Sequence, residues 1–334
     1  MTDWFEALTG FHEADYQTTR SNLELHGEQL RSKANGRRFR IGRLETPTLA
    51  DLRARGTPVL SGLTGRLRVS AVSGEARAMH RDPAHSNALF QVASQFNLLE
   101  MTGPNVTPEE GVTRYAHDHT QGPACAIAAG AATLYRNYLA PVAGQAGQTH
   151  DRQIDCLRDV GEALGNTDGS LWTMRNGYAL CTQAGLARID SVLATSSDEE
   201  LDALRAHLRI GLHWDVDVTD MPAPNHRVSQ AFCSALPVAY TRVPAQHWAR
   251  FATLVLEASY EATLWAGVIN AHERRSRLVC LTHVGGGAFG NLETWIHAAQ
   301  LRALEKFSRV DLDVRLVSFG APSQAQTRLA EHFN

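Results

Sequence analysis

The sequence predicts an α/β fold in which a mixed, mainly parallel β-sheet has helices on both faces. From residue 65 onward, short apolar segments alternate with helical patterns of ten or more residues, which is typical of parallel strands joined by helices. The chain has 334 residues, 43% of them hydrophobic and 20% charged, which suits a domain with a large core. Ligands of such folds bind at the carboxyl ends of the strands. We therefore expect the functional site in the loops that follow the strands.

The first 64 residues are predicted to form an N-terminal extension with a β-hairpin. In residues 28–44, EQLRSKANGRRFRIGRL, Asn35 and Gly36 supply the two positive-φ positions that a tight two-residue turn requires. The main domain is predicted over residues 65–325. In it, a short strand ends at residues 73–75, and a buried strand over residues 87–97 ends at Asn97. A polar loop over residues 98–123 then leads to a helix of small residues over 124–139.

An insertion is predicted around residues 141–205. It contains helical patterns over residues 151–164 and 198–208 and a hairpin over 172–181, with Asn176 and Gly177 in its turn. A strand over residues 208–218 and the breaker-rich segment MPAPNH (221–226) follow. The remaining elements alternate: strands are predicted over residues 228–240, 277–284 and 313–319, and helices over 247–272 and 292–308.

Composition excludes several classes of protein. No segment approaches the roughly 18 consecutive apolar residues of a transmembrane helix, and the acidic N-terminus lacks the pattern of a secretory signal. The formal net charge of -3 gives no general basic footprint for nucleic acid. The five cysteines are scattered without a C-x-x-C pair, so we expect them to be buried and reduced. The expected location is cytoplasmic, or a host cytosol reached by a non-classical secretion route, without membrane or nucleic-acid partners.

The segment CLTHVGGGAFGNLETW (280–295) joins an apolar strand directly to three glycines and then to a helix. Each glycine costs about 1 kcal/mol relative to alanine unless a Cβ cannot fit there. Unpaired N–H groups and the helix dipole at this position favour a phosphate or diphosphate. A tight turn that lets helix and strand pack closely is the alternative. The loop is neither a Walker loop, since no Gly-Lys-Ser/Thr follows, nor an early Rossmann fingerprint, since it lies near the C-terminus.

The order of these features resembles the macrodomain superfamily over roughly residues 65–320. Gly74-Glu75 stands where macrodomains have a Gly-Asp turn, Asn97 stands at the entry of their catalytic loop, and residues 283–291 resemble their second loop, with Phe289 as its aromatic residue. The resemblance implies a macrodomain-like three-layer α/β/α sandwich that binds ADP-ribose. It implies that Glu75 binds the adenine amino group, residues 285–290 the diphosphate, and Asn97 the distal ribose.

The departures from the family narrow the expected activity. No Gly-Gly-Gly run follows Asn97 and no Gln-Glu-Glu signature is present, while the loop over residues 98–123 is long and rich in acids and histidines. This architecture is most similar to the MavL-like arginine-specific ubiquitin ADP-ribosylhydrolases. The resemblance implies a hydrolase without a cofactor that removes mono-ADP-ribose from a protein side chain, arginine-linked and with ubiquitin as a candidate partner. A non-catalytic ADP-ribose reader and a hydrolase of free ADP-ribose derivatives are the alternatives.

Cleavage of an N-glycosidic bond builds positive charge on the sugar, so the site needs a carboxylate near the anomeric carbon and an activated water. Asp118 lies between two histidines immediately before a helix; the alternative is that it caps the helix while the histidines face solvent. Asp215 and Asp217 share one face of a predicted strand, with an exposed acidic face as the alternative. The predicted catalytic candidates are Asp118, Asp215, Asp217 and Glu100. We do not expect them to bind a metal ion.

The predicted ligand-binding residues lie on the turn at residue 75, the loop after residue 95 and the glycine loop. His283 could donate to a phosphate oxygen, or be a hydrogen-bonded structural histidine. Phe96 and Phe289 could shield the ribose from water, or belong to the core. The full predicted set is Glu75, Phe96, Asn97, Leu99, His283, Gly285, Gly286, Gly287, Ala288, Phe289, Gly290 and Asn291.

Overall fold

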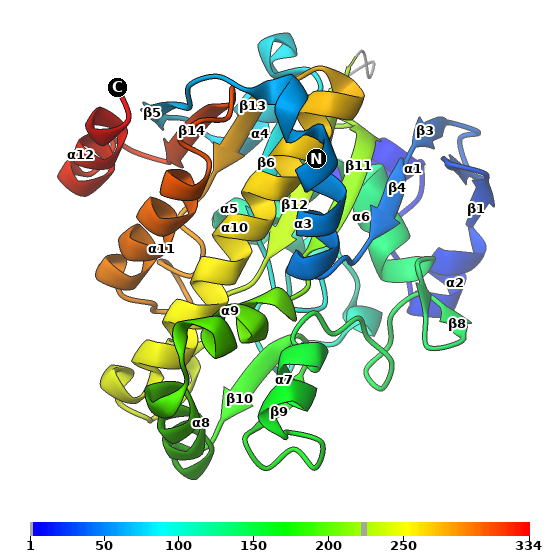
Figure 1. The fold of residues 1–334 in the computed structure, drawn as a ribbon. Helices are drawn as coiled ribbons and strands as arrows, with labels where there is room; N and C mark the ends of the chain where they lie inside the picture. Colours follow the sequence, from blue (N-terminus) through cyan, green and yellow to red (C-terminus); the bar gives the residue numbers. More distant parts are fainter. Residues whose placement is uncertain (1–2, 222–225) are drawn as a thin grey trace.

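A seven-stranded mixed sheet forms the centre of the structure, a computed structural model that describes residues 3–221 and 226–334 (Figure 1). Five neighbouring strands of the sheet, from β12 to β5, run parallel, whereas β11 and β4 pair antiparallel at one side. The predicted mixed, mainly parallel sheet is therefore confirmed. In spatial order the strands are β4 (Arg43–Glu45), β11 (Gly211–Asp217), β12 (Arg227–Cys233), β6 (Leu89–Ala93), β13 (Leu278–Leu281), β14 (Asp313–Ser318) and β5 (Arg68–Ser73).

Helices cover both faces of this sheet (Figure 1). Successive residues of β6 point to opposite faces. Gln91 Nε2 donates to Thr263 Oγ1 of α10 at 2.9 Å, while the Phe90 ring stacks on His80 of α4 with the centroids 3.9 Å apart. The three-layer arrangement follows from these contacts. One layer has α3 (Leu49–Gly56), α10 (Ala249–Arg274) and α11 (Glu293–Lys306); the other has α4 (Ala76–Arg81), α5 (Gln121–Ala128) and α6 (Gly130–Tyr138).

The N-terminal segment forms a small three-stranded sheet and then contributes to the central one. The predicted hairpin is present as β2 and β3, but its turn is longer than two residues, because Ser32 N–H donates to the Arg37 carbonyl at 3.1 Å and only Gly36 has a positive φ, of 70°. Strand β4 then joins the central sheet beside β11. The elements are α1 (Trp4–Thr9), α2 (Tyr16–Ser21), β1 (Leu23–His26), β2 (Gln29–Ser32), β3 (Arg38–Arg40) and η1 (Thr57–Leu63).

The segment between α6 and β11, which was predicted as an insertion, contains short strands as well as helices. The turn of its predicted hairpin has positive φ at both Asn176 (47°) and Gly177 (79°), as the dipeptide indicated. The first predicted helix begins seven residues late, at Arg158, and α8 was not predicted. The elements are β7 (Pro141–Val142), β8 (Gln145–Ala146), α7 (Arg158–Leu164), β9 (Trp172–Arg175), β10 (Tyr178–Cys181), α8 (Gln183–Thr195) and α9 (Asp198–Ala206).

Two predicted elements near the site end early. The helix expected over residues 124–139 is two helices, because Thr219 N–H donates to the Ala128 carbonyl and Gly130 N–H donates to Thr219 Oγ1, at 2.8 and 2.7 Å. The strand expected to reach Asn97 ends at Ala93.

The other short helices are η2 (Pro83–His85), η3 (Pro108–Glu110), η4 (Thr113–His117), η5 (Val238–Tyr240) and η6 (Ala245–Trp248), and α12 (Gln324–His332) packs beside β5.

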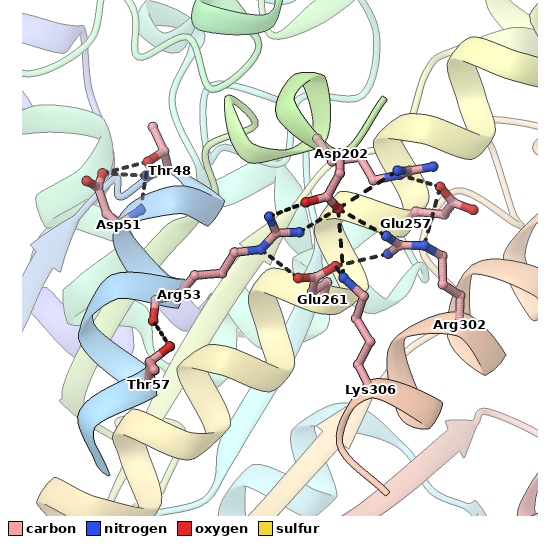
Figure 2. A network of polar contacts seen from close by, with 10 residues as sticks. Thr48, Asp51, Arg53, Thr57, Asp202, Glu257, Glu261, Arg302 and Lys306 are labelled. Atoms are coloured by element: carbon pink, nitrogen blue, oxygen red, sulfur yellow. Dashed lines mark hydrogen bonds and ion pairs between the residues drawn. The ribbon is translucent and has the colours of Figure 1, made fainter. Parts of the chain in front are cut away.

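A network of ion pairs joins α3, α9, α10 and α11 on one side of the sheet (Figure 2). The Glu261 carboxylate of α10, whose side chain is 1% exposed, accepts from Arg53 Nε at 2.7 Å, Arg302 Nη1 at 3.0 Å and Lys306 Nζ at 2.8 Å. Asp202 of α9 accepts from Arg53 Nη1 at 2.6 Å. The buried carboxylate is thus paired with cations from two neighbouring helices, as a buried charge requires.

Two further expectations from composition can be compared with the structure. All five cysteines are free and buried, as predicted. Within residues 3–221 and 226–334, no helix is both long and apolar enough to cross a bilayer. Most of the predicted breaker-rich segment, at residues 222–225, lies outside the described residues.

Candidate active site

A cavity of about 490 Å³ opens at the carboxyl ends of the parallel strands. Its lining comes from segments that follow each parallel strand: Glu75 after β5, Gln95 after β6, Ala235 after β12, His283 after β13 and Phe319 after β14. The volume lies in the range typical of small-molecule sites. This is the position at which the sequence analysis expected a ligand.

The glycine loop after β13 presents unpaired backbone donors at this cavity. Three of its N–H groups are used within the loop: Gly286 donates to the His283 carbonyl at 3.1 Å, Gly290 to the Gly287 carbonyl at 3.0 Å and Asn291 to the Gly285 carbonyl at 3.0 Å. Four others find no acceptor in the part of the chain that the structure describes, and the residues that carry them all line the cavity. These residues are Gly285, Gly287, Ala288 and Phe289. Such a cluster of free donors, in the loop that precedes α11, is suited to an anion.

The loop has this shape because of Gly285 and Asn291. Gly285 has a φ of 77°, and a Cβ there would overlap the Ala235 Cβ, so the position requires glycine. Asn291 Nδ2 donates to the Leu236 carbonyl at 2.8 Å, which holds the loop against the segment after β12. Asn291 was predicted to bind the ligand, but it is buried and does not line the cavity, and Gly286 and Gly290 do not line it either. Their role is to shape the loop.

His283 lines the cavity beside this loop, as predicted. Its Nε2 has no partner among the residues with described positions, and its ring centroid lies 5.1 Å from that of His297. Burial, and to a lesser degree the neighbouring His297, lowers the pKa of His283 below 6.5. The imidazole is therefore mainly neutral at pH 7, so that one ring nitrogen can donate and the other accept.

Glu100 is a buried carboxylic acid at the cavity wall. The residue is 3% exposed, lines the cavity, and its Oε1 has no hydrogen-bond partner within the described ranges. Its carboxyl group packs on Gly122 in the first turn of α5, where a Cβ would overlap it. Burial raises the pKa of Glu100 well above 4.5, and the buried Arg136 guanidinium opposes this only in part. Glu100 therefore keeps its proton to a higher pH than an exposed glutamate, which suits a general acid.

Asp118 is the second carboxyl group at this end of the cavity. Its Oδ1 accepts from Thr120 N–H at 2.8 Å, just before α5, and His117 and His119 are exposed. The hydrogen bond and the exposed histidines agree with the alternative of a residue that orders the start of the helix. Because Asp118 also lines the cavity together with Glu100, it keeps its candidacy for catalysis.

The other two predicted catalytic residues lie elsewhere. Asp215 sits at a β-bulge with a φ of 61° and pairs with Arg40 at 2.9 Å and Arg227 at 3.0 Å, while Asp217 accepts from Arg40 N–H at 2.7 Å. Neither lines the cavity. The reason is strand direction. Because β11 runs antiparallel to β12, the carboxyl end of β11 lies beside the amino ends of the parallel strands, away from the cavity. The structure therefore does not bring these two residues to the cavity.

Phe96, Asn97 and Leu99 do not line the cavity either, because β6 ends before them and they turn into the protein. Asn97 Nδ2 donates to Gln153 Oε1 at 2.9 Å, and its Oδ1 accepts from Leu99 N–H at 3.1 Å. Phe96 N–H donates to the Gly177 carbonyl at 3.1 Å. These residues join the loop after β6 to the insertion instead of contacting a ligand.

Glu75 lines the cavity near the end of β5, as predicted. Its carboxylate also caps α4, accepting from the N–H groups of Arg77 and Ala78 at 2.8 Å each. A carboxylate has further lone pairs with which to accept from a ligand amino group. Arg77, by contrast, forms a bidentate pair with Asp220 at 2.8 Å and does not line the cavity.

Beside the predicted Phe289, aromatic residues that the sequence analysis missed form part of the wall. The rings of Tyr178, Tyr240 and Phe289 are mutual neighbours, with centroids 4.9 to 5.5 Å apart. Tyr178 comes from the insertion and Tyr240 from the segment after β12, so no local pattern could have linked them. Phe319 is 82% exposed at the rim. Its place at the end of a predicted strand was a usable signal.

The charged side chains of the cavity lining are acidic. Glu75, Glu100 and Asp118 line it, and the lining residues within the described ranges include neither lysine nor arginine. An anionic group would therefore depend on backbone N–H donors, and a cationic group would be favoured near the carboxylates. Among residues 3–221 and 226–334, no three His, Cys, Asp or Glu side chains are placed to hold a metal ion together.

Comparisons with known proteins give structural similarity only. No protein-family model matches the chain, and no curated protein matches its sequence. The poly(ADP-ribose) glycohydrolase from Thermomonospora curvata bound to the inhibitor ADP-HPD is 12% identical over 98% of this chain and 97% of its own, with a TM-score of 0.47. That from Deinococcus radiodurans in complex with ADP-ribose is 12% identical over 87% and 91%, with a TM-score of 0.43. Because the sequence identities are this low and the TM-scores are below 0.5, we assign residue roles in this chain from its own contacts alone.

Proposed function

We propose that the protein is an ADP-ribosylhydrolase that removes mono-ADP-ribose from a protein side chain. One observation carries the proposal: the same cavity is lined by four residues with unpaired backbone N–H groups and by two carboxyl groups, those of the buried Glu100, whose pKa is raised, and of Asp118. The donors supply an anion site, and the carboxyl pair supplies what hydrolysis of a glycosidic bond requires.

The order of these groups along the sheet edge supports ADP-ribose as the ligand. The carboxyl groups follow β6, the glycine loop follows β13, and Phe319 and Glu75 follow β14 and β5. Three strand spacings of about 4.8 Å separate the first group from the last, or about 14 Å. An extended molecule with a diphosphate at its centre fits this order. Its distal ribose would lie near Glu100 and its adenine near the exposed Phe319 ring and the Glu75 carboxylate.

The carboxyl pair provides a balanced hydrolytic step. Glu100 donates its proton to the leaving nitrogen as the bond between that nitrogen and the anomeric carbon breaks. Asp118 stabilises the positive charge that develops on the sugar and accepts a proton from water as the new carbon–oxygen bond forms. The products are ADP-ribose and the unmodified side chain, and transfer of the proton from Asp118 back to Glu100 through solvent restores the starting state.

The acidic lining supports an arginine linkage. A guanidinium group is a permanent cation that pairs with carboxylates and stacks on aromatic faces. The cavity lining offers Asp118 and the Tyr178, Tyr240 and Phe289 rings, and its described residues include no lysine or arginine. Ubiquitin as the modified protein, and a cytoplasmic location or delivery to a host cytosol, stay predictions from the sequence.

The test is release of ADP-ribose from defined substrates. The protein is incubated with arginine-, glutamate- and serine-linked mono-ADP-ribosyl peptides and, separately, with poly(ADP-ribose), and the products are identified by chromatography and mass spectrometry. We expect release from the arginine-linked peptide and none from the same peptide with the Glu100→Gln variant. Binding of ADP-ribose without release from any substrate would leave only a reader, and release from the polymer alone would contradict the mono-ADP-ribosyl assignment.

A further inference from the structure

We infer that Glu13, in the N-terminal segment, is a positioning residue that fixes the two carboxyl groups Glu100 and Asp118 relative to each other. The inference rests on the proposed function and assigns the N-terminal segment a part in it. Glu13 does not line the cavity, so it would act only through the loop that carries the two acids.

One residue of that loop, Tyr115, contacts both acids. Glu100 N–H donates to Tyr115 Oη at 3.0 Å, and Asp118 N–H donates to the Tyr115 carbonyl at 3.2 Å. Tyr115 is 1% exposed and lies in the short helix η4. The separation of the two carboxyl groups therefore depends on where η4 is held.

Glu13 holds the start of η4. Its carboxylate accepts from Val112 N–H at 2.9 Å through Oε1 and at 3.0 Å through Oε2, and from Thr113 N–H at 2.7 Å through Oε2. The Tyr138 hydroxyl of α6 donates to Glu13 Oε1 at 2.6 Å. Tyr115 N–H in turn donates to the Val112 carbonyl at 3.0 Å. Hydrogen bonds to a charged acceptor are short and strong, so this carboxylate ties the N-terminal segment, η4 and α6 together.

The chain makes room for this contact at Gly111. The residue has a φ of 84°, and a Cβ there would lie 2.6 Å from the Glu13 Cδ atom. Glycine is thus required both for the backbone conformation and for the approach of the carboxylate. Trp4 adds a second tie, since its Nε1 donates to the Thr113 carbonyl at 3.2 Å.

The same parts also share a hydrophobic core. Phe5, Leu8 and Tyr16 of the N-terminal segment pack in one buried cluster with Val112 and Tyr115. Because packed side chains leave little free volume, this cluster restricts the movement of η4 relative to the N-terminal segment. Glu13 supplies the polar contact that sets the position of η4 on the segment.

The variant that tests the inference is Glu13→Gln, which keeps the shape but replaces one acceptor oxygen with an NH₂ group facing backbone donors. The matched control is Asp15→Asn, which removes a carboxylate from the same segment; Asp15 accepts from Thr18 N–H at 3.0 Å, at the start of α2. We expect kcat on the arginine-linked peptide to fall about tenfold for Glu13→Gln, with the Kd for ADP-ribose unchanged within about twofold. The control should match the wild type in both.

Amide hydrogen exchange tests the contact between Glu13 and the start of η4 independently of activity. For Glu13→Gln we expect faster exchange at Val112, Thr113 and residues 114–120, with unchanged exchange in α10. If the wild-type protein hydrolyses no substrate, the proposed function fails, while the exchange result still decides whether Glu13 holds η4. Unchanged exchange and unchanged kcat in Glu13→Gln would overturn the inference, and so would an equal loss of ADP-ribose affinity, which would indicate a general structural effect.

Discussion

At the scale of single residues, the central group is Glu100, because burial raises its pKa well above 4.5. It lies under the first turn of α5 with one carboxyl oxygen unpaired and with Arg136 as the nearby buried cation. Arg136 itself is committed to other partners: its Nε donates to the Leu98 carbonyl at 3.1 Å and its Nη2 to Thr133 Oγ1 at 2.9 Å. Arg136 therefore offsets the burial of Glu100 only in part.

Replacement of Glu100 by glutamine should separate chemistry from binding. We expect Glu100→Gln to lower kcat by about 10²- to 10⁴-fold, the usual contribution of a general acid, with ADP-ribose affinity preserved. The measurement is kcat on the arginine-linked peptide together with Kd from calorimetry. Glu110→Gln is the matched control, since Glu110 is exposed in the same loop and outside the cavity. A Glu100→Gln variant with wild-type kcat would remove the assigned role.

The pH dependence of stability gives a second prediction for Glu100. Its pKa is raised in the folded protein, so above its ordinary value of 4.5 the folded chain holds a proton that the unfolded chain loses. The free energy of unfolding therefore falls as pH rises from 4.5 to the folded pKa. The Glu100→Gln variant has no group that titrates there, so it lacks this decrease in stability. In denaturant titrations, the stability of the variant relative to wild type should increase with pH in that window. A difference independent of pH would show that Glu100 is not perturbed.

At the scale of elements, the glycine loop between β13 and α11 determines which ligand can bind. A Cβ at Gly287 would meet no protein atom within 4 Å, although the residue lines the cavity. A methyl group there would stand where a diphosphate approaches the free N–H groups. We expect Gly287→Ala to weaken ADP-ribose binding about tenfold, or about 1.4 kcal/mol, with the melting temperature unchanged.

The control for that substitution is Gly62→Ala, where a Cβ would also meet nothing within 4 Å and which lies outside the cavity. Calorimetry and thermal unfolding of the two variants, measured side by side, check the prediction. Equal ADP-ribose affinity in Gly287→Ala and wild type would mean that the ligand does not approach this backbone.

At the scale of the whole molecule, the ion-pair network of Figure 2 joins four helices on the side of the sheet that carries α10. Burial raises the pKa of Glu261, but hydrogen bonds from Arg53 and Lys306 outweigh this effect, so that its pKa lies below 4.5. A carboxylate with a lowered pKa contributes stability above its unfolded pKa, and this contribution is lost as pH falls through the folded pKa.

Glu261→Gln should therefore destabilise the protein at pH 7 by about 2 kcal/mol, because it removes the buried charged acceptor of Arg53, Arg302 and Lys306, which keep only Asp202 and Glu257 as acidic partners. The difference from wild type should shrink as pH falls below 4.5, the ordinary pKa of glutamate. Denaturant unfolding at several pH values measures both effects. Asp190→Asn, which breaks the exposed pair with Arg250, is the control and should change stability by about 0.5 kcal/mol or less. Equal effects of the two substitutions would contradict this account.

The parts of the fold that could be predicted from the sequence depend on local chemistry. The alternation of strands and helices, the turn at Asn176 and Gly177, and the glycine loop all follow from residue types that restrict the nearby backbone. The predictions that the structure did not bear out concern positions that depend on residues distant in the sequence. Thr219 divides the helix near Ala129, and pairing with β12 turns the end of β11 away from the cavity, which removed Asp215. The aromatic wall needed Tyr178 and Tyr240 to meet across the fold.

The most direct test of the central claim is a calorimetric titration of the wild-type protein with ADP-ribose and, separately, with AMP. If the free amides of the glycine loop hold a diphosphate, ADP-ribose should bind at one site per chain with a micromolar Kd, and AMP should bind at least about tenfold more weakly. Absence of ADP-ribose binding at millimolar concentration, or equal affinity for AMP, would contradict the claim.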